Sequence, residues 1–380
     1  MNNLIDRSEK QSILEKAGAP CGPPTERSAP LERDGSMTLD CTIMNPLDHQ
    51  GWNDEFAVRG GGSFFHSREW AEVLAETYGY KPVYIAFREA QSLIDVLPLM
   101  EVRSPLTGRR GVSLPFTDYC ALSGDKGRSL RAALGPVLDY ARKWGWKYVE
   151  LRCGDLADVQ PSTFFYRHTL DLTGGEDAVW SRFKSNTRRN IKKGQRQGVE
   201  LASFETRDAI DTYYDLHCLT RKRHGLPPQP HSFFRKIFEH VISKGKGFVV
   251  LAHHEDRPVA GGVYFRFGRK ALYKFGASDM ACQAIRPNNL VMWEAIRRLA
   301  NEGCEELCFG RTEEENKGLR QFKRAWGTEE TILNYYRYDV AAECFVTESA
   351  PVKKLHHRIF GMMPVPVLKI LGSLLYKHMG

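Results

Sequence analysis

The fold class is decided by residues 247–277, GFVVLAHHEDRPVAGGVYFRFGRKALYKFGA. This stretch contains three runs rich in β-branched and aromatic residues, which are 247–254, 258–267 and 270–277. The first two runs turn on the polar sequence HEDR, 254–257, and the last two turn on the dipeptide Gly-Arg, 268–269. Because runs of this kind joined by short turns pair as antiparallel neighbours, the pattern predicts a β-meander.

Helical periodicity precedes and follows the meander. Before it we expect helices over 177–197, 209–223 and 231–243, and after it a helix over 289–301, a strand over 306–309, a helix over 319–326 and a strand over 332–338. The first half of the chain repeats this order, with a helix over 68–78, strands over 82–87, 93–102 and 111–116, a helix over 130–144 and a strand over 147–152. The order of elements predicts an α/β (α+β) fold of mixed sheets flanked by helices. The repetition of this order, without an alignable sequence repeat, suggests two related domains.

Composition divides the 380 residues into four segments. Residues 1–37 are rich in proline, glycine and charge, so we expect them to form a disordered tail. We expect a first folded domain at 38–170, a second at 171–340 and an apolar-basic appendix at 341–380. With 42% hydrophobic residues the chain as a whole is expected to be globular.

The cellular compartment follows from what the sequence lacks. The N-terminus has no apolar core typical of a signal peptide, and no run reaches the ~18 apolar residues of a membrane-spanning helix. Nine cysteines without a CxxC pair argue against a zinc site or a disulfide framework and favour a reducing compartment. We therefore expect a cytoplasmic protein without a metal site.

Basic charge is concentrated in residues 181–199, SRFKSNTRRNIKKGQRQGV. Seven basic residues and no acid give this stretch a charge of +7, which leaves +1 of the chain's net +8 for everything else. Arg188 and Lys192 lie one turn apart on one helix face, and Arg189 lies beside them. Because like charges on a helix repel and no acid is near, the pattern favours a phosphate-bearing partner. A solvated basic face is the equal alternative.

Two backbone features favour ligand binding. In residues 309–327, FGRTEEENKGLRQFKRAWG, a buried strand ends at Gly310 and Arg311 follows at its carboxyl end, a usual ligand position in open α/β sheets. Asn288 and Asn289 begin a helix, and free N–H groups at a helix start bind anions. An ordinary Asn-capped helix is the alternative at the second position.

Lys323 is the candidate for chemistry. It lies between Phe322 and Trp326, so it can occupy a dry pocket in which its charge stabilises a developing oxyanion. The alternative is a helix that buries its apolar residues and exposes Lys323.

Several common catalytic motifs are absent. The sequence has no P-loop, no GxGxxG after a strand, no GxSxG, no HExxH and no set of kinase motifs. Nucleotide hydrolysis, nicotinamide chemistry and serine hydrolysis therefore lack their usual support.

The last segment, 351–380, has five lysine or arginine residues and no acid among many apolar residues. From Val367 onward the apolar positions follow helical spacing. A basic helix with one apolar face suits a membrane surface. Packing of this helix onto the second domain is the equal alternative.

The order of several motifs resembles the FemAB family over about residues 60–340. The motifs are Ser63-Phe64-Phe65-His66-Ser67 with Trp70, Leu114 to Tyr119, Trp180 to Val199, Gly261 to Glu294 and Phe309 to Gly327. The chain looks closest to the FemAB-like branch found with exosortase (PEP-CTERM) exopolysaccharide loci. The resemblance implies two tandem GNAT-like domains. It also implies transfer of an aminoacyl or acyl group to an amine of a peptidoglycan, cell-envelope or exopolysaccharide precursor.

The resemblance also implies roles for individual residues. Lys323, which follows Phe322, matches the lysine that stabilises the oxyanion, and Arg188 matches an arginine that holds substrate phosphate. Asp118 is the candidate general base. The other candidates for substrate binding are Arg189, Lys192, Tyr273, Asn288, Asn289, Arg311 and Trp326.

The implied partners are a phosphorylated envelope precursor, aminoacyl-tRNA or acyl-CoA as donor, and the inner membrane surface through 351–380; no cofactor is implied. GNAT enzymes bind the pyrophosphate of acetyl-CoA with a Q/RxxGxG/A turn, and here residues 283–288 read QAIRPN, without glycine. Two alternatives stay open. One is a CoA-dependent N-acyltransferase, and the other is a non-catalytic polyanion-binding component of an envelope-polysaccharide system.

Overall fold

The computed structural model describes residues 40–57, 62–89, 92–120, 122, 130–152, 156, 159–347 and 355–380. The tail expected at 1–37 lies outside these described residues.

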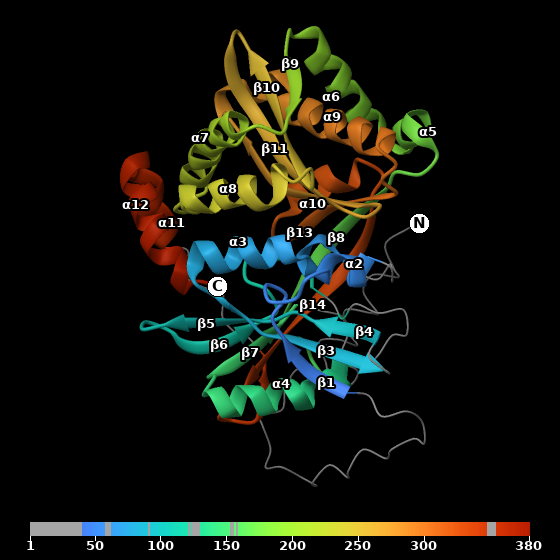
Figure 1. Cartoon of the computed structure of the whole chain (residues 1–380). Coiled ribbons are helices and arrows are strands. Elements are labelled where there is room, and N and C mark those ends of the chain that lie inside the picture. Colours follow the sequence, from blue (N-terminus) through green and yellow to red (C-terminus); the bar gives the residue numbers. More distant parts are fainter. Residues whose placement is uncertain are drawn as a thin grey trace, which may run out of the picture. The chain divides into compact units, whose positions relative to one another are not determined.

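One long mixed sheet extends through the described chain (Figure 1). Its strands, in spatial order, are β2 (Lys81–Pro82), β5 (Met100–Ser104), β6 (Gly108–Val112), β7 (Tyr148–Leu151), β14 (Glu329–Asp339), β8 (Thr163–Asp171), β13 (Glu306–Thr312), β12 (Lys270–Ser278), β11 (Arg257–Phe267), β10 (Gly247–His254) and β9 (Glu200–Phe204), with β15 (Cys344–Val346) paired to β14. A second sheet contains β1 (Asp40–Met44), β3 (Tyr84–Glu89) and β4 (Ser92–Leu97), all antiparallel. The expected fold class, mixed sheets flanked by helices, is confirmed.

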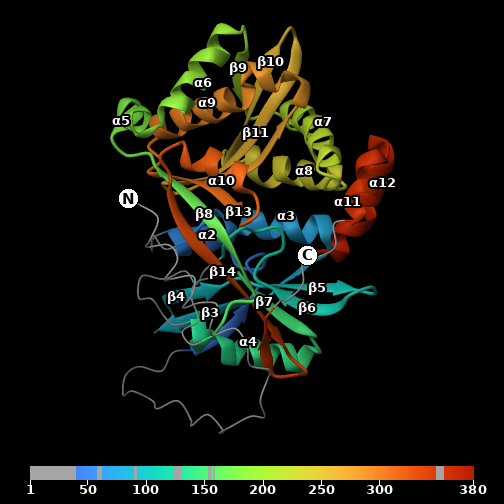
Figure 2. The same cartoon turned by 180° about the vertical axis from the view of Figure 1, so that it is seen from behind.

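The helices cover both faces of the sheets. They are α2 (Trp52–Ala57), η1 (Phe64–His66), α3 (Arg68–Tyr78), α4 (Leu130–Trp144), α5 (Gly175–Arg182), α6 (Ser185–Arg196), α7 (Arg207–Arg223), α8 (His231–Ile237), η2 (Phe238–Ile242), η3 (Met280–Ile285), α9 (Pro287–Asn301), α10 (Lys317–Arg324), α11 (Leu355–Met362), α12 (Val365–Leu375) and η4 (Tyr376–His378). The helices α6 and α9 lie side by side, as both views show (Figures 1 and 2).

The predicted β-meander is present as β10, β11 and β12, paired antiparallel in that order. Its alternating side chains enter two different cores, as the two-residue period of a strand requires. Val249 and Phe265 belong to the core shared with α3, α7 and α8, whereas Phe248 and Tyr264 belong to the core shared with α5, α6 and α9. Burial on both faces explains why these strands read as nearly continuous apolar runs.

The strands β8 and β14 join the two halves of the molecule. β8 pairs with β13 on one side and β14 on the other, and β14 pairs with β8 over 329–335 and with β7 over 336–339. Hydrogen bonding in the sheet is therefore continuous across residue 170, where the sequence suggests a domain boundary. β8 was not predicted because its sequence, TFFYRHTLD, is mostly half-buried and lacks a clean alternation.

Two predicted strands are wrong in extent. The strand expected over 93–102 is two strands, β4 and β5, which belong to different sheets. Pro98 separates them, and a proline cannot donate a backbone hydrogen bond to a ladder. The strand expected over 111–116 ends at Val112, because the chain then turns through Leu114 and Phe116, whose φ angles are 55° and 58°.

Two predicted helices are interrupted. The basic helix expected over 177–197 is two helices, α5 and α6, separated by Phe183 and Lys184 in extended conformation, with ψ of 139° and 151°. Phe183 is buried against Trp293 and Trp326, and this packing requires the break. The helix expected over 231–243 is α8 followed by the π-helical turn η2.

The C-terminal appendix folds back onto the molecule. Leu368 and Tyr376 are buried, and the Tyr376 hydroxyl accepts a hydrogen bond from Arg221 of α7 at 2.6 Å. The hydroxyl of Tyr80 donates to the Tyr376 carbonyl at 3.1 Å. One face of the appendix is therefore packed on the fold. Among the described residues, no helix combines the length and the apolar character needed to cross a bilayer.

Candidate functional site

A cavity of about 500 Å³ opens where the pairing of β12 with β13 ends. The two parallel strands pair only over 270–272 and 306–308, so their later residues are free to form a wall. Residues of α7, α9 and α10 complete the lining. Six residues singled out from the sequence line this cavity: Asp118, Tyr273, Asn288, Arg311, Phe322 and Lys323.

Lys323 reaches the cavity from the buried side of α10. Only 3% of the residue is exposed, and its Nζ donates to the carbonyls of Gly310 and Arg311, each at 3.0 Å. An ammonium group has three donors, and the third has no acceptor among the described residues, so it is available to a group in the cavity. The alternative of an exposed Lys323 is therefore wrong.

The charge on Lys323 is destabilised by its surroundings. Burial lowers its pKa to about 8, and the positive charge of Arg311 acts in the same direction, while Asp118 and Cys308 act against it. The ammonium form is thus present at neutral pH but poorly solvated. Such a group interacts strongly with any negative charge that develops beside it.

Two arginines anchor the helix that carries Lys323. The Nε atoms of Arg320 and Arg324 lie 2.8 and 2.7 Å from Oε2 of Glu330 on β14. Burial alone raises the pKa of Glu330, but the two arginines outweigh it and bring this pKa to about 2. Glu330 also contacts His168 of β8 at 2.9 Å. This network attaches α10 to two strands of the sheet and thereby positions Lys323.

Gly310 allows a carboxylate to approach the end of β13. Its φ is +70°, and a Cβ added there would lie 3.1 Å from Oδ2 of Asp118. Arg311 stacks on Phe165, with 4.4 Å between the guanidinium carbon and the ring centre, and donates to the Tyr335 hydroxyl at 3.1 Å. The Tyr335 hydroxyl in turn donates to the backbone carbonyl of Asp118. Asp118 and Arg311 are thus held in one polar cluster.

Lys274 also lines the cavity and was not expected from the sequence. Its side chain is 4% exposed, and its Nζ lies 3.6 Å from Oδ2 of Asp118 and 5.0 Å from the ring centre of Phe65. Burial lowers the pKa of Lys274, and Asp118 opposes this effect. The signal that could have identified it is a single lysine inside the apolar run ALYKFGA. A cation at such a position must find a partner or serve a ligand.

Tyr273 and Asn288 add polar groups to the cavity wall. A Cβ at Gly276 would lie 1.6 Å from the Tyr273 hydroxyl, so the glycine makes room for this side chain. Burial raises the pKa of Tyr273 to about 12, so its hydroxyl stays protonated at neutral pH. The amide of Asn288 donates to Oγ of Ser278 at 3.1 Å, which orients it at the start of α9.

A second, smaller cavity of about 120 Å³ adjoins the first. Asp118 and Gly310 line both cavities. The smaller one is otherwise formed by η1 and by side chains that include Phe65, Arg167 and Cys308. The two cavities therefore meet beside Asp118 and Gly310.

Two predicted binding residues do not line either cavity. Trp326 has no exposed surface, and its ring centre lies 5.0 Å from that of Phe183. Asn289 is 7% exposed within the first turn of α9. Both residues pack in the core of the second half.

The three predicted phosphate-binding residues lie on α6, away from the cavity lining. Thr187 and Ile191 face the core, while Arg188, Arg189 and Lys192 lie on the outer side of the helix. None of these three forms an ion pair with a residue that the structure describes. The structure thus separates a basic surface on α6 from the cavity that contains Lys323.

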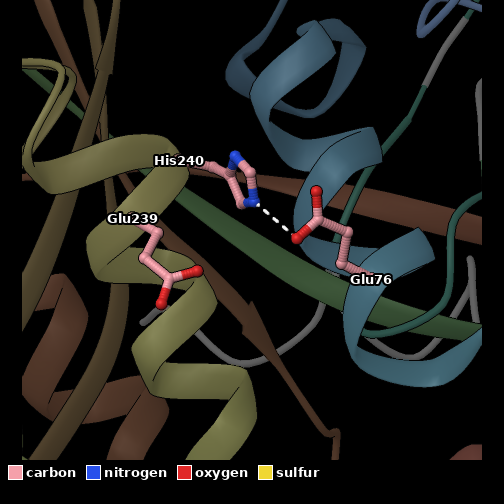
Figure 3. Close-up of side chains that lie close together, drawn as sticks. All are labelled: Glu76, Glu239 and His240. Atoms are coloured by element: carbon pink, nitrogen blue, oxygen red, sulfur yellow. Dashed lines mark ion pairs between the residues drawn. The ribbon is translucent and has the colours of Figure 1, made fainter.

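A cluster of possible metal ligands occurs between α3 and η2 (Figure 3). It contains Glu76, Glu239 and His240, and the His240 ring lies 3.0 Å from the Glu76 carboxylate. However, Nζ of Lys236 lies 2.7 Å from an oxygen of both glutamates. The lysine already supplies the positive charge that a metal ion would bring, so the cluster is an ion-pair network between the two helices.

Comparisons with known proteins concern the domain family and the fold. Residues 181–324 match the acetyltransferase (GNAT) domain family. A UDP-N-acetylmuramoylpentapeptide-lysine N(6)-alanyltransferase of Weissella viridescens is 26% identical over 124 residues, which are 32% of this chain and only 36% of that protein. The crystal structure of FemX superposes with a TM-score of 0.62 at 13% identity and covers 78% of this chain and 96% of that chain.

A tandem GNAT protein from the clavulanic acid biosynthesis pathway superposes with a TM-score of 0.52 at 12% identity, covering 80% of this chain and 99% of that chain. These structures share the arrangement of a mixed sheet flanked by helices with the chain described here. The family match over residues 181–324 and these superpositions show that this chain has a GNAT-like fold.

Proposed function

We propose that this protein is an acyltransferase that moves an aminoacyl group from an activated donor to an amine on a phosphorylated cell-envelope or exopolysaccharide precursor. The observation that carries the proposal is the buried ammonium of Lys323 beside the junction of two cavities. Its third donor is unused by the described residues, and Asp118 and Gly310 line both cavities. The similarity to an alanyltransferase supports the same type of reaction.

The reaction needs few protein groups. The acceptor nitrogen attacks the carbonyl carbon of the donor ester, and the carbonyl oxygen becomes an oxyanion that the Lys323 ammonium stabilises. Collapse of this intermediate breaks the C–O bond, and the departing oxygen leaves as a hydroxyl of the donor. The acceptor amine loses one proton in the process, and Asp118, at the junction of the cavities, is the candidate to receive it and to pass it to the departing oxygen.

Cationic lining favours a phosphate-bearing substrate. Lys274, Lys323, Arg311 and Arg223 line the larger cavity, whereas Asp118 is the only carboxylate among the described lining residues. Charged groups in such a partly buried site interact with phosphate more strongly than they do in water.

The donor proposed is aminoacyl-tRNA. At the turn that would receive the pyrophosphate of acetyl-CoA, several donors are already used: the backbone N–H groups of Cys282, Arg286 and Asn289 donate to the carbonyls of Asp279, Gln283 and Arg286 at 3.1–3.3 Å. These groups are therefore not free to bind a pyrophosphate. By contrast, α6 exposes basic residues that have no ion-pair partner among the described residues, and they suit the backbone of an RNA.

A CoA-dependent N-acyltransferase is the second candidate, because the matched domain is that of GNAT acetyltransferases. Transfer assays with a mixed pool of labelled aminoacyl-tRNA and, separately, with acetyl-CoA distinguish the two. Mass spectrometry of nucleotide-linked and lipid-linked amine acceptors identifies the product. We expect mass increments of an amino-acid residue from the tRNA pool only. An acetyl increment would select the second candidate, and the absence of any product with either donor would contradict both.

A further inference from the structure

The helices α11 and α12 have two unlike faces. On one face Leu368 and Gly372 are buried against the segment that follows α7, where a Cβ at Gly372 would lie 2.0 Å from the carbonyl of Pro228. On the other face apolar side chains are 42–78% exposed, and they are Ile359, Met362, Val367, Ile370 and Leu374. A contiguous row of this kind differs from the scattered apolar residues of an ordinary surface and indicates an interaction site.

The row follows helical geometry. Val367, Ile370 and Leu374 are spaced i, i+3 and i+7, which places them on one side of α12, opposite the buried Leu368 and Gly372. On α11, Ile359 and Met362 are also exposed and are spaced i, i+3. Both helices lie at the edge of the molecule beside α7 (Figures 1 and 2).

The described residues of 351–380 carry charges of one sign, while Asp215 of α7 lies beside Lys369. Residues 351–380 contain no acid, and Arg358 and Lys377 are exposed beside the apolar row. Lys369 is paired with Asp215 of α7 at 3.1 Å, so the cations that remain free are those on the outer side. A second copy of the same surface would bring like charges together. Anionic lipid headgroups would instead be attracted to the cations while the apolar side chains enter the acyl boundary.

The row also lies near the larger cavity. Arg223 and His224, at the end of α7, line that cavity. A Cβ at Gly361 of α11 would lie 3.8 Å from the carbonyl of Lys222, one residue before Arg223. The end of α7 is therefore shared by the cavity wall and the contact with α11.

We propose that the exposed apolar row of α11 and α12 docks on an anionic membrane surface and brings the cavity to lipid-linked acceptors. The choice of a lipid-linked acceptor rests on the proposed function, whereas the docking itself does not. The occupant is a bilayer rather than a second copy of the chain, because the exposed cations Arg358 and Lys377 would face their own counterparts in a second copy.

Full-length protein is tested for co-sedimentation with vesicles of phosphatidylcholine alone and of phosphatidylcholine mixed with phosphatidylglycerol. Point variants are preferable to removal of the segment, because buried Tyr376 belongs to the fold. The test variant is Ile370→Glu with Leu374→Glu. The matched control is Ile43→Glu with Ile332→Glu, which alters two equally exposed apolar residues on other surfaces.

We expect the wild type and the control to bind phosphatidylglycerol vesicles equally, and the test variant to bind at least about tenfold more weakly. Replacing Arg358 and Lys377 by glutamate should weaken binding by about fivefold or more per residue on anionic vesicles only. Equal binding by the test variant and the control, or no binding by the wild type, overturns the proposal. Light scattering adds a separate outcome: a wild-type dimer that the test variant abolishes, without vesicle binding, shows a subunit interface instead.

The docking proposal and the proposed function fail in different ways. If only docking is wrong, the protein still transfers its acyl group to a water-soluble acceptor but does not bind vesicles. If only the proposed function is wrong, vesicle binding persists while no donor and acceptor pair gives a product.

Discussion

Replacing Lys323 by methionine tests the oxyanion role most directly. Methionine keeps much of the buried aliphatic volume next to Phe322 and removes only the ammonium. Lys323 is 3% exposed and two carbonyls hold its ammonium at 3.0 Å, so this group is already oriented when substrate arrives. A single preorganised oxyanion donor contributes ~3 kcal/mol, so kcat should fall by roughly 100-fold or more. Lys323→Arg should rescue only in part, because a planar guanidinium does not fit the position of a compact ammonium.

The pH dependence of the loss of turnover in Lys323→Met tests the charge state of Lys323. With a pKa lowered to about 8, Lys323 is protonated at neutral pH and loses its proton as the pH rises through that value. The acceptor amine also titrates, so the informative quantity is the ratio of wild-type to Lys323→Met turnover at each pH. This ratio should be constant below about pH 7 and fall about tenfold per pH unit above about 8.

The assay follows transfer of a labelled aminoacyl group from tRNA to the amine acceptor by mass spectrometry. Lys317→Met is the matched control, since it removes an exposed lysine from the same helix and should leave turnover unchanged. Near-ultraviolet circular dichroism verifies that both variants are folded. A ratio near 1 at neutral pH would refute the oxyanion role. A ratio that rises through pH 8 would instead show the neutral amine acting as a base.

Three further outcomes concern the cavity, the network that holds α10, and the basic surface of α6. Gly310→Ala forces an alanine into a φ of +70° against the Asp118 carboxylate. The free energy of unfolding in urea should fall by about 1–2 kcal/mol, and kcat should fall with it. Wild-type values for both would contradict the close approach of Asp118 to Gly310. The arginines of α10 lower the pKa of Glu330 from 4.5 to about 2. Its contribution to the free energy of unfolding, on the order of 3 kcal/mol, should therefore be present above pH 4.5 and lost as the pH falls toward 2. Glu330→Gln should remove this part of the pH dependence, and an unchanged acid-unfolding curve would argue against the stabilising network of Glu330 with the two arginines. Arg188→Ala should weaken tRNA binding and reduce the slope of the logarithm of the binding constant against the logarithm of the salt concentration by about 1, between roughly 50 and 200 mM salt. Arg257→Ala, an exposed control on β11, should change neither. Equal slopes for the two variants would indicate that α6 is only a solvated surface.

Local patterns in the sequence were enough to predict several parts of the structure. The meander over 247–277 is predictable because strand period and turn residues are both local properties. In 309–327, the glycine after a buried strand and the lysine between aromatic residues do line one cavity, while the roles assigned to them stay predictions. The predicted continuous helix over 177–197 fails because Phe183 is drawn into a core formed by remote residues.

Other features of the fold and of the site were decided only by the tertiary structure, because they depend on residues far apart in the chain. The residues that pair between β8 and β14 are about 160 positions apart in the sequence, and no local pattern in TFFYRHTLD predicts that pairing. Lys274 becomes part of the site only because Asp118 and Phe65 of the first half cover it. The pKa of Lys323 is likewise set by burial and by Arg311, which are products of packing. Periodicity and turn chemistry are encoded within a few residues and can be predicted from them, whereas strand pairing, desolvation and charge proximity exist only once distant segments meet.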